Sequence, residues 1–410
     1  MHNDCYFKDT CRLCKSRVKL ALELTPTPPA NELVRREDLG KEQDVFPLEL
    51  WTCSTCGHVQ LGHVVSPQRL FGRGSYPYRS GTSPVFRDHL QRYAIDLVQR
   101  YGRPKRVLEI GSNDGTFLTH FVQMGIDVVG IEPDAEAAQE AIEKGVYTIN
   151  DYFDRKQLTE DIQVADLIVA NHVFAHINDL SDVAAGIKQL LPDHGHFVFE
   201  VGYLPDVIKN NLFDTIYHEH VSYHTLGPLV RFFESFSMVL YDAERVATQG
   251  GAIRCYVQPN RARCVVHERL AKLLAYEKEN GFSPSIINIT IGFWGQSIHE
   301  QCNRISKTLH EYKQNGLHIA GYGAPAKCVT MMHHMDFGSD VLDFIVDDNP
   351  KKHGLFTPGQ NVEILPVSAL YERKPDIVVV LAWNFADSII AAHPEFNFLV
   401  PLPELKMVQR

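Results

Sequence analysis

The sequence has no excess of positive charge. Its 410 residues contain 40 Lys and Arg against 50 Asp and Glu, which gives a formal net charge of −10. A protein that binds nucleic acid needs a basic stripe to neutralise phosphate groups, and this balance does not provide one. We therefore expect no nucleic-acid partner, although the composition leaves room for one local basic pocket that binds a nucleotide diphosphate.

Long apolar runs, internal repeats and low-complexity tracts are also missing. No run reaches the roughly 18 apolar residues that cross a bilayer, and the polar residues 1–15 are not typical of a signal peptide. We expect a cytoplasmic protein without membrane contact, either a monomer or a weak oligomer. In that compartment the nine cysteines are expected to be reduced thiols or metal ligands rather than disulfides.

The chain is otherwise ordinary globular material, with 44% hydrophobic and 22% charged residues and enough length for two or three domains. Residues 1–78 hold short segments around two cysteine pairs. Residues 79–260 alternate strand and helix patterns, and residues 261–410 begin helical and then alternate again. Such alternation predicts mostly parallel sheets covered by helices, so the expected fold class is α/β with two sheet domains behind a cysteine-containing module.

The periodicity also predicts individual elements. A helix is expected over Pro84–Tyr101, and a hairpin that closes the central sheet is expected at 238–257, turning through Gln249, Gly250 and Gly251. Residues 262–316 are expected to be helical, with a break at 281–284. The other expected strands cover 106–110, 127–131, 166–170, 196–200, 318–321, 343–346 and 376–381, and the other expected helices cover 326–335 and 384–392.

Two C-x-x-C pairs, Cys11/Cys14 and Cys53/Cys56, are separated by 38 residues. Four thiolates suit a tetrahedral Zn²⁺, and Gly57 gives the second pair the backbone freedom that a tight knuckle needs. The alternative is a pair of redox dithiols, which normally requires a C-x-x-C that opens a helix in a βαβ unit. We predict one structural zinc ion, because a site with four cysteine ligands has no open position.

A glycine-containing turn follows the strand expected at 106–110. Its pattern is Glu-x-Gly-x-x-x-Gly, and it lacks the G-x-G-x-x-G of dinucleotide sites because Asn113 stands where the second glycine belongs. The pattern provides no close approach for a pyrophosphate. It favours S-adenosylmethionine, whose amino-acid tail the acidic residue and the turn backbone can hold. The predicted contacts are Glu109, Gly111, Ser112, Asn113, Asp114 and Gly115.

Two further strand ends complete the predicted cofactor site. Glu132 and Pro133 follow the second strand, where a carboxylate can accept hydrogen bonds from both ribose hydroxyls. Asn171 and His172 follow the third strand, at the carboxyl edge where open α/β sheets bind ligands. The turn and these two strand ends together favour a methyl donor over a nicotinamide cofactor.

The segment Tyr217-His218-Glu219-His220 concentrates titratable groups. Methyl transfer to carbon needs a base beside a carbonyl and a donor that holds the oxyanion, and a neutral histidine can be that base. We predict catalytic roles for Tyr217, Glu219 and His220. A metal site built on His-x-His and a solvated loop remain as alternatives. His176 is a further candidate, because it is expected close to the transferred methyl group.

A second glycine-containing turn opens the carboxy-terminal domain. Gly321-Tyr-Gly-Ala-Pro-Ala-Lys327 follows an expected strand and begins a helix, so backbone N–H groups and Lys327 can cradle an anion. We predict a clamp for a nucleotide diphosphate, and a cofactor site that has lost its ligand is the alternative. The predicted contacts are Tyr322, Lys327, Asp347 and Lys351.

These motifs, in this order, resemble a known family, the sugar C-3 methyltransferases of deoxysugar biosynthesis. The family acts on nucleotide-linked 4-keto-6-deoxyhexoses. The order of the motifs along the chain is more specific than any one of them. The resemblance covers nearly the whole length and includes the two cysteine pairs, the turn 108–115, Val173-Phe-Ala-His176, Tyr217-His-Glu-His220, Gln249-Gly-Gly-Ala-Ile-Arg254 and the turn 321–327.

The resemblance implies a zinc-binding domain at 1–78 and a Rossmann-like S-adenosylmethionine-dependent methyltransferase domain at 79–260. A helical linker and a smaller Rossmann-like sugar-nucleotide domain would follow at 261–410. Substrate would lie in the cleft between the end domains and the central one. His220 would match the general base of the family, and Tyr217, Glu219 and His176 would line the sugar.

Three further residues follow from the same resemblance. Tyr76 or Tyr78 would match a tyrosine near the cofactor, and Arg254 is expected to contact the substrate. The chain departs from the family at Asn171-His172, where Asn-Asn is expected.

The predicted function is methylation of C-3 of a TDP- or GDP-linked 4-keto-6-deoxy sugar, through an enolate formed by His220, in the biosynthesis of a branched-chain deoxysugar. An NAD(P)-dependent nucleotide-sugar reductase or epimerase is the enzymatic alternative, and the missing G-x-G-x-x-G speaks against it. A zinc-bearing binding module with an inactive methyltransferase fold is the other alternative. The intact segment at 217–220 speaks against that one.

Overall fold

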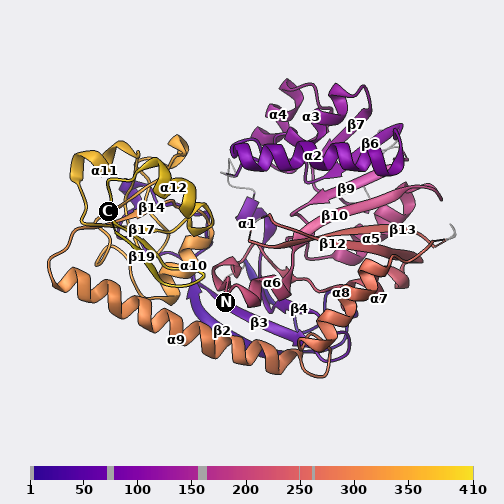
Figure 1. The fold of residues 1–410 in the computed structure, drawn as a ribbon. Helices are drawn as coiled ribbons and strands as arrows, with labels where there is room; N and C mark the ends of the chain where they lie inside the picture. Colours follow the sequence, from indigo (N-terminus) through magenta and orange to yellow (C-terminus); the bar gives the residue numbers. More distant parts are fainter. Residues whose placement is uncertain (1–3, 72–77, 156–163, 249, 261–263, 410) are drawn as a thin grey trace.

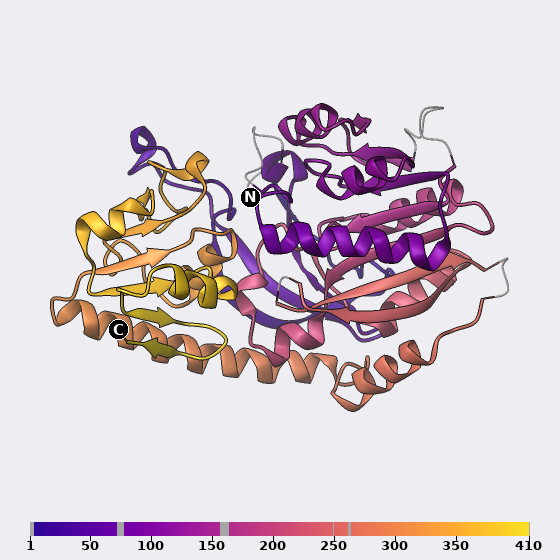
Figure 2. The ribbon, with the colours of Figure 1, turned by 45° about the horizontal axis from the view of Figure 1, so that its top comes forward.

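The computed structural model describes residues 4–71, 78–155, 164–248, 250–260 and 264–409. Figure 1 shows two α/β domains side by side, joined along one side by the long helix α9 (Ile287–Gln314). Strands β2 (Val18–Thr27) and β3 (Phe46–Cys53) of the amino-terminal part run beside this helix, and the turned view in Figure 2 agrees. The amino-terminal strands thus lie between the two larger domains.

The amino-terminal part forms a real sheet rather than only short segments around cysteines. Its strand order is β11-β4-β3-β2, with β4 at Val59–Leu61 and β11 at Ser222–Tyr223. Strand β11 comes from the central region of the chain, because Ser222 pairs with Gln60 and Tyr223 with Val59. The remaining elements are β1 (Cys5–Phe7), which pairs antiparallel with β5 (His63–Val65), the 3₁₀ turn η1 (Arg36–Asp38), and α1 (Pro67–Phe71).

The central domain is built on a seven-stranded sheet. Its strands in spatial order are β12 (Met238–Val246), β13 (Ala252–Pro259), β10 (His196–Gly202), β9 (Leu167–Asn171), β6 (Arg106–Ile110), β7 (Asp127–Ile131) and β8 (Thr148–Ile149). Strands β10 to β8 of this order run parallel, and the hairpin β12–β13 joins β10 antiparallel, as predicted. Near-continuous apolar runs in β6, β7 and β9 suit parallel strands that helices cover on both faces.

Helices alternate with these strands along the chain, and helix α2 precedes the first of them, β6. The long helix α2 begins with Ser83 as N-cap, whose hydroxyl accepts from Phe86 N, and with Pro84 in its first turn. The helices of this domain are α2 (Pro84–Tyr101), α3 (Thr116–Gln123), α4 (Ala135–Glu143), α5 (Leu180–Leu190), α6 (Leu204–Lys209) and α7 (Leu226–Ser235), with the 3₁₀ turn η3 (Phe213–Thr215).

The carboxy-terminal domain has a six-stranded sheet in the order β16-β15-β14-β17-β18-β19. All of its strand pairs are parallel except β18 with β19. The elements are β14 (Ile319–Tyr322), α10 (Lys327–His334), β15 (Phe344–Val346), η4 (Pro350–Lys352), β16 (Ile364–Leu365), α11 (Ser368–Arg373), β17 (Ile377–Val380), η5 (Trp383–Phe385), α12 (Ala386–Ala392), β18 (Phe398–Val400) and β19 (Lys406–Val408).

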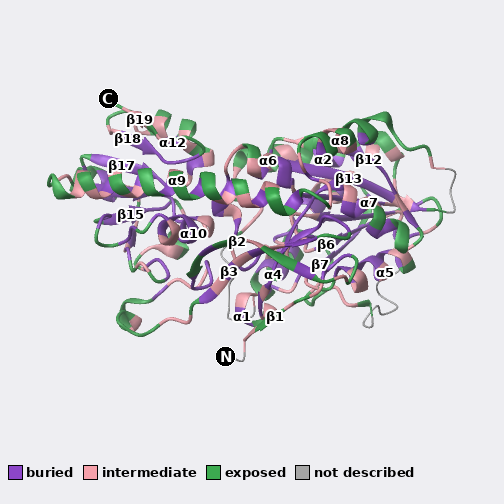
Figure 3. Cartoon of the chain, turned by 90° about the horizontal axis from the view of Figure 1, so that it is seen from below, coloured by how far each residue is buried: buried purple, intermediate pink, exposed green. Residues whose placement is uncertain are grey.

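Two helices, α8 (Glu268–Glu279) and α9, link the domains. They are separate helices, as the break predicted at 281–284 requires. The buried residues of α9 recur every three or four positions, so they form one apolar stripe. This stripe belongs to a core that also contains Leu48 and Leu50 of β3 and Ile319 of β14. Figure 3 shows the opposite, exposed side of the helix from below. The helix therefore joins the amino-terminal sheet to the carboxy-terminal domain through a shared core.

The predicted fold class is confirmed. Most element bounds lie within one or two residues of the expected ones, and the short strands β8, β16, β18 and β19 were not predicted. No helix among the described residues has the length and apolar character that crossing a membrane requires.

Glu277 of α8 fastens the start of α7 to the linker. Its carboxylate is 3% exposed and accepts from Leu226 N at 2.6 Å, Gly227 N at 3.0 Å and Tyr203 Oη at 3.0 Å. The first N–H groups of a helix have no partner inside the helix, and a carboxylate there also suits the helix dipole. Since Thr225, the N-cap of α7, makes no side-chain cap, Glu277 supplies the cap from another helix.

We expect Glu277→Ala to lower the free energy of unfolding by about 2–4 kcal/mol, because three donors, two of them in buried hydrogen bonds, lose their acceptor. Glu279→Ala, at an exposed position of the same helix, is the matched control and should change stability by less than about 0.5 kcal/mol. Denaturant unfolding followed by circular dichroism measures both. Equal stability of the two variants would contradict the capping role.

Candidate active site

The predicted cofactor turn begins where β6 ends. Gly111 and Ser112 both donate their backbone N–H to Ile131 O of β7, at 2.8 and 3.2 Å. Gly111 has a φ of 69°, and a side chain there would approach Val173 Cγ2 to 2.4 Å. Gly115, with a φ of 71°, opens α3. The turn therefore needs glycine at 111, because the chain that leaves β9 lies directly against it.

Three buried polar atoms at this turn have no hydrogen-bond partner: Glu109 Oε2, Ser112 Oγ and Asn171 Oδ1. The other carboxylate oxygen of Glu109 accepts from Asn171 Nδ2 at 2.9 Å. Burial raises the pKa of Glu109 well above its ordinary value. Since buried polar atoms are seldom left unpaired, this group of atoms fits a polar ligand. The ammonium of the S-adenosylmethionine tail would supply donors and would favour the ionised carboxylate.

Glu132, 6% exposed, occupies the end of β7. One carboxylate oxygen accepts from Asn113 N and the other from Asp134 N, both at 2.8 Å. Burial raises the pKa of Glu132, and these two N–H groups oppose the shift. Each oxygen keeps a lone pair that can accept from a ribose hydroxyl. Pro133 contributes its carbonyl to Asn150 Nδ2 at 3.1 Å.

A strap of residues 78–81 lies across the turn. Asn113 Oδ1 accepts from Ser80 N at 2.9 Å, and Asn113 Nδ2 donates to Tyr78 O at 3.2 Å. Asp114 Oδ2 accepts from Gly81 N at 3.1 Å. The side chains of Asn113 and Asp114 therefore hold the strap, although both were predicted as direct cofactor contacts.

The strap is fastened on both sides. Asp114, 3% exposed, also accepts from Lys144 Nζ at 2.9 Å. Despite its burial, its pKa is lowered, because Lys144 and neighbouring donors favour the charged form. Arg79 Nε donates to Glu140 of α4 at 2.9 Å. The predicted cofactor tyrosine Tyr76 lies outside the described residues.

The predicted substrate residue Arg254 lies within the central domain. It is 5% exposed, donates through Nε to Glu200 Oε1 at 2.7 Å, and stacks 3.5 Å above the ring centre of Tyr93. Glu200 also contacts His89 Nε2 at 2.9 Å and His172 Nε2 at 3.8 Å. Arg254 thus holds the carboxylate that faces His172, rather than presenting its own guanidinium to a ligand.

The predicted catalytic residues His176 and His220 lie next to this turn. His176 N donates to Val173 O at 2.8 Å, and Val173 is the residue that lies against Gly111. The imidazole rings of His176 and His220 stack at 5.1 Å between centres with an angle of 26° between their planes. Phe71 stacks on His176 at 6.2 Å. The structure therefore brings His176 and His220 together, next to the predicted cofactor turn.

His220 is held by a hydrogen bond on each nitrogen. Its Nδ1 lies 2.7 Å from Thr215 O and its Nε2 lies 2.9 Å from Tyr217 Oη. A carbonyl oxygen only accepts, so Nδ1 carries the proton and Nε2 presents the lone pair. Burial lowers the pKa of His220 from 6.5 to about 4, with the Thr215 carbonyl opposing the shift. The imidazole is therefore neutral at physiological pH, with Nε2 as its basic nitrogen.

The other two residues of the segment point elsewhere. Glu219, 1% exposed, accepts from Asn31 Nδ2 of the amino-terminal part at 2.6 Å. His218 Nε2 lies 3.3 Å from Phe46 O, so it faces the amino-terminal sheet and not His220. Among the described residues, the cysteine quartet is the one group of three or more ligating side chains close enough to hold a metal. The metal site built on His-x-His is therefore not formed.

The carboxy-terminal turn is closed by acidic residues. Gly323, with a φ of 87°, donates its N–H to Val346 O at 2.7 Å, and Ala324 N donates to Asp347 Oδ2 at 2.7 Å. Asp347 also contacts Lys352 Nζ at 3.3 Å. Tyr322 Oη lies 3.3 Å from His393 Nε2. Asp347 therefore already accepts the hydrogen bond from one of the backbone N–H groups that were predicted to bind an anion.

The two predicted lysines lie apart. Lys327 is turned inward, where its Nζ donates to Asn384 Oδ1 at 2.8 Å and lies 4.0 Å above the Trp383 ring centre. Lys351 is half-exposed and reaches Glu136 of the central domain at 3.2 Å. Lys351 is the predicted substrate residue whose ammonium solvent can reach.

The four cysteines of the amino-terminal part meet in space. Their Sγ atoms all lie within 4.8 Å of one another, with Cys11–Cys56 at 3.6 Å and Cys14–Cys53 at 3.4 Å. A tetrahedral Zn²⁺ with bonds of about 2.3 Å separates its sulfur ligands by about 3.8 Å. The quartet therefore fits a four-thiolate zinc site.

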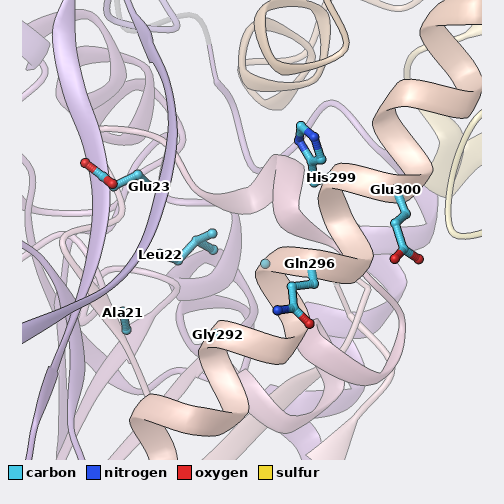
Figure 4. Close-up of a pocket in the computed structure, with 8 residues that line it drawn as sticks. Ala21, Leu22, Glu23, Gly292, Gln296, His299 and Glu300 are labelled. Carbon is cyan, nitrogen blue, oxygen red and sulfur yellow. The ribbon is translucent and has the colours of Figure 1, made fainter.

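A shallow groove of about 460 Å³ lies between β2 and α9, shown in Figure 4. None of the residues that line it is a predicted site residue. They are Ala21, Leu22, Glu23, Gly292, Gly295, Gln296, His299 and Glu300.

Sequence reasoning missed three residues that shape the site. Thr215 supplies the carbonyl that orients His220, Asn31 holds Glu219, and Ser80 fastens the strap. Thr215 lies five residues before His220, so its position was open to notice. The contacts of Asn31 and Ser80 join segments 188 and 33 residues apart, and no local pattern marks them.

Solved structures resemble about half of the chain. The magnesium protoporphyrin IX methyltransferase of Synechocystis, with bound S-adenosylhomocysteine, is 13% identical, with a TM-score of 0.35 over 47% of this chain and 91% of that one. An S-adenosylmethionine-dependent methyltransferase from Clostridium acetobutylicum is 15% identical, with a TM-score of 0.35 over 42% and 91%.

Sequence comparison covers the whole chain. Three family models match: "Putative zinc binding domain" at 11–71, "Methyltransferase domain" at 86–238 and "C-methyltransferase C-terminal domain" at 247–403. The C-methyltransferase NovU of Streptomyces niveus is 32% identical over 412 residues, which covers 98% of this chain and 97% of the relative.

These matches confirm the family predicted from the motifs and, with it, the two cofactors, S-adenosylmethionine and zinc. The enzymatic alternative, a nicotinamide-dependent reductase or epimerase, is wrong. Because the identity extends over nearly the full length of both chains, this chain belongs to the S-adenosylmethionine-dependent C-methyltransferases that carry an amino-terminal zinc-binding domain.

Proposed function

We propose that this C-methyltransferase methylates C-3 of a nucleotide-linked 4-keto-6-deoxy sugar, with TDP or GDP as the nucleotide, during biosynthesis of a branched-chain deoxysugar. The observation that carries the proposal is the neutral imidazole of His220, whose basic nitrogen Nε2 faces the hydroxyl of Tyr217 and whose ring stacks on His176 beside the predicted cofactor turn. The family resemblance of the motifs supports the sugar substrate.

The 4-keto group acidifies the proton on C-3 of such a sugar. His220 Nε2 removes this proton, and the electron pair that remains forms an enolate. Burial raises the pKa of Tyr217 well above its ordinary value, so its hydroxyl stays protonated. With substrate bound, this hydroxyl would turn from His220 Nε2, to which it donates in this structure, to the enolate oxygen and so leave Nε2 open to the C-3 proton. When bound, S-adenosylmethionine supplies the methyl group, which becomes bonded to C-3 as its bond to sulfur breaks.

The neutral state of the His176 and His220 imidazoles suits a site that binds a positively charged sulfonium. Burial lowers the pKa of His176 well below its ordinary value, so both stacked imidazoles are neutral. Neutral rings do not repel the sulfonium as it binds, and the positive charge that His220 gains with the C-3 proton is balanced by the negative charge of the enolate. The remaining task of the site is to hold carbon and methyl group in line, which accounts for much of the barrier in bimolecular reactions.

The carboxy-terminal domain would hold the nucleotide diphosphate. The half-exposed ammonium of Lys351 is the group best placed for it, since it now pairs with a surface carboxylate, Glu136, in a contact worth little in water. Tyr322 would take part from the turn behind it, whereas the ammonium of Lys327 is turned inward against Trp383 and Asn384.

We expect His220→Asn to bind S-adenosylmethionine as the parent does and to lose at least about a hundredfold in kcat, the usual contribution of a general base. Calorimetry measures the binding. Mass spectrometry of a TDP-linked 4-keto-6-deoxy sugar after incubation, with a gain of one methylene unit, measures turnover. The control His194→Asn removes an exposed imidazole, and full turnover by His220→Asn would exclude His220 as the base.

The pH dependence of kcat follows from the lowered pKa of His220. A base must be neutral, and a pKa of about 4 keeps it so at pH 5.5, where an imidazole with a pKa of 6.5 is about nine-tenths protonated. Turnover should therefore persist at pH 5.5 and fall only as the pH approaches 4. An acidic limb centred near 6.5 in the pH profile of the methyl-transfer assay would be inconsistent with the buried geometry.

The zinc ion is expected to stabilise the amino-terminal sheet rather than take part in the chemistry, since four thiolates leave no open position. Cys53→Ser should reduce the zinc content well below one per chain and lower the apparent Tm by more than about 5 °C. Cys5→Ser, in strand β1 of the same part, is the control. Metal analysis and thermal unfolding measure the two effects, and unchanged values for Cys53→Ser would refute the structural site.

A further inference from the structure

The carboxy-terminal domain holds the segment just before the reacting residues. Trp383 Nε1 donates to Asp214 Oδ2 at 2.5 Å, and Thr330 Oγ1 donates to Ile216 O at 2.7 Å. All of these atoms are buried, and helix α10, which carries Thr330, packs directly on η3. Two side chains of one domain therefore fasten residues 214 and 216 of another.

The residue between them is Thr215, whose carbonyl accepts from His220 Nδ1 at 2.7 Å. A neutral imidazole has one proton, and the group that accepts it decides which nitrogen keeps the lone pair. The position of this carbonyl therefore sets both the tautomer of His220 and the direction in which Nε2 points. With its neighbours on both sides held, the Thr215 carbonyl has little freedom to turn.

The Trp383 contact is strengthened by charge. Asp214 is fully buried, and its second oxygen, Oδ1, has no hydrogen-bond partner. Burial raises the pKa of Asp214 and the charge of the Lys327 ammonium opposes this rise; the same ammonium lies 4.0 Å above the Trp383 ring centre and donates to Asn384. A buried carboxylate is costly unless it is paired and hydrogen-bonded, so Asp214 depends on the indole N–H and on this ammonium.

We propose that Trp383 and Thr330 are positioning residues for methyl transfer, which act through the Thr215 carbonyl to orient the imidazole of His220. This rests on the proposed function, in which His220 is the base. The carboxy-terminal domain then has a second role besides binding substrate, because it fixes the orientation of the His220 imidazole. Neither residue is among the predicted contacts of the substrate or the methyl donor.

The test uses Trp383→Phe, which keeps an aromatic ring under Lys327 and removes the indole N–H. We expect kcat to fall about tenfold to a hundredfold, as small misplacements of a reacting group do, with KM for both substrates changed by less than about twofold. Trp294→Phe is the matched control. Trp294 is also buried and donates its indole N–H to Asn211 Oδ1 at 2.7 Å, close to η3 but outside the residues that hold Thr215.

A second variant, Thr330→Val, removes only the hydroxyl that holds Ile216 O. It should lower kcat in the same way and keeps the proposal testable should Trp383→Phe fail to fold. Equal losses of kcat in Trp383→Phe and Trp294→Phe would show a general effect on packing and would overturn the proposal. So would parent-like kcat in both Trp383→Phe and Thr330→Val.

The tautomer of His220 gives a readout that does not depend on turnover. In ¹⁵N-histidine spectra of the full chain, the signal that disappears in His220→Asn identifies His220, and the parent should show it protonated at Nδ1. Trp383→Phe should mix the two tautomers, and Trp294→Phe should not. An unchanged tautomer in Trp383→Phe would overturn the proposal. A mixed tautomer with a fully active His220→Asn would instead refute only the role of His220 as base.

Discussion

The segment 213–223 has almost no regular structure of its own, and its shape depends on hydrogen bonds from the parts of the chain on either side of the central domain. The carboxy-terminal domain holds its start through Trp383 and Thr330. The amino-terminal part holds its middle, where Asn31 meets Glu219, and its end, where β11 pairs with β4. An irregular segment pays a large conformational entropy to adopt one shape, so it stays ordered only where the surroundings determine it.

The methyl-donor turn is a contrasting case, because local rules determine it. Its glycines take positive φ, its backbone bonds reach the neighbouring strand, and its acidic residue is the last but one of a buried strand. Each of these features depends on neighbours in sequence or on the adjacent strand. This is why the pattern around Glu109, the two α/β sheets and the cysteine quartet could be predicted from the sequence.

The roles of long charged side chains could not be predicted in the same way. Arg254, Lys327 and Lys351 were all expected from their motifs to contact substrate, but the motifs do not contain the partners that the structure gives them, which are Glu200, Trp383 and Glu136 in turn. Such a side chain extends several ångströms from its backbone and can meet any partner within that radius. Its partner is decided by tertiary packing, which a motif does not contain.

The zinc site and the Trp383 contact act on opposite ends of the same segment. Cys53 ends β3 and Cys56 lies in the turn that leads to β4, so a metal at the quartet fixes the strand with which Ser222 and Tyr223 pair. Trp383 fixes Asp214 at the other end. His220 lies between these two anchors, and its proposed role as a base with a single useful tautomer requires rigidity at both. A zinc ion that takes no part in the proposed chemistry would therefore still bear on it, because it supports one of the two ends from which the imidazole is held.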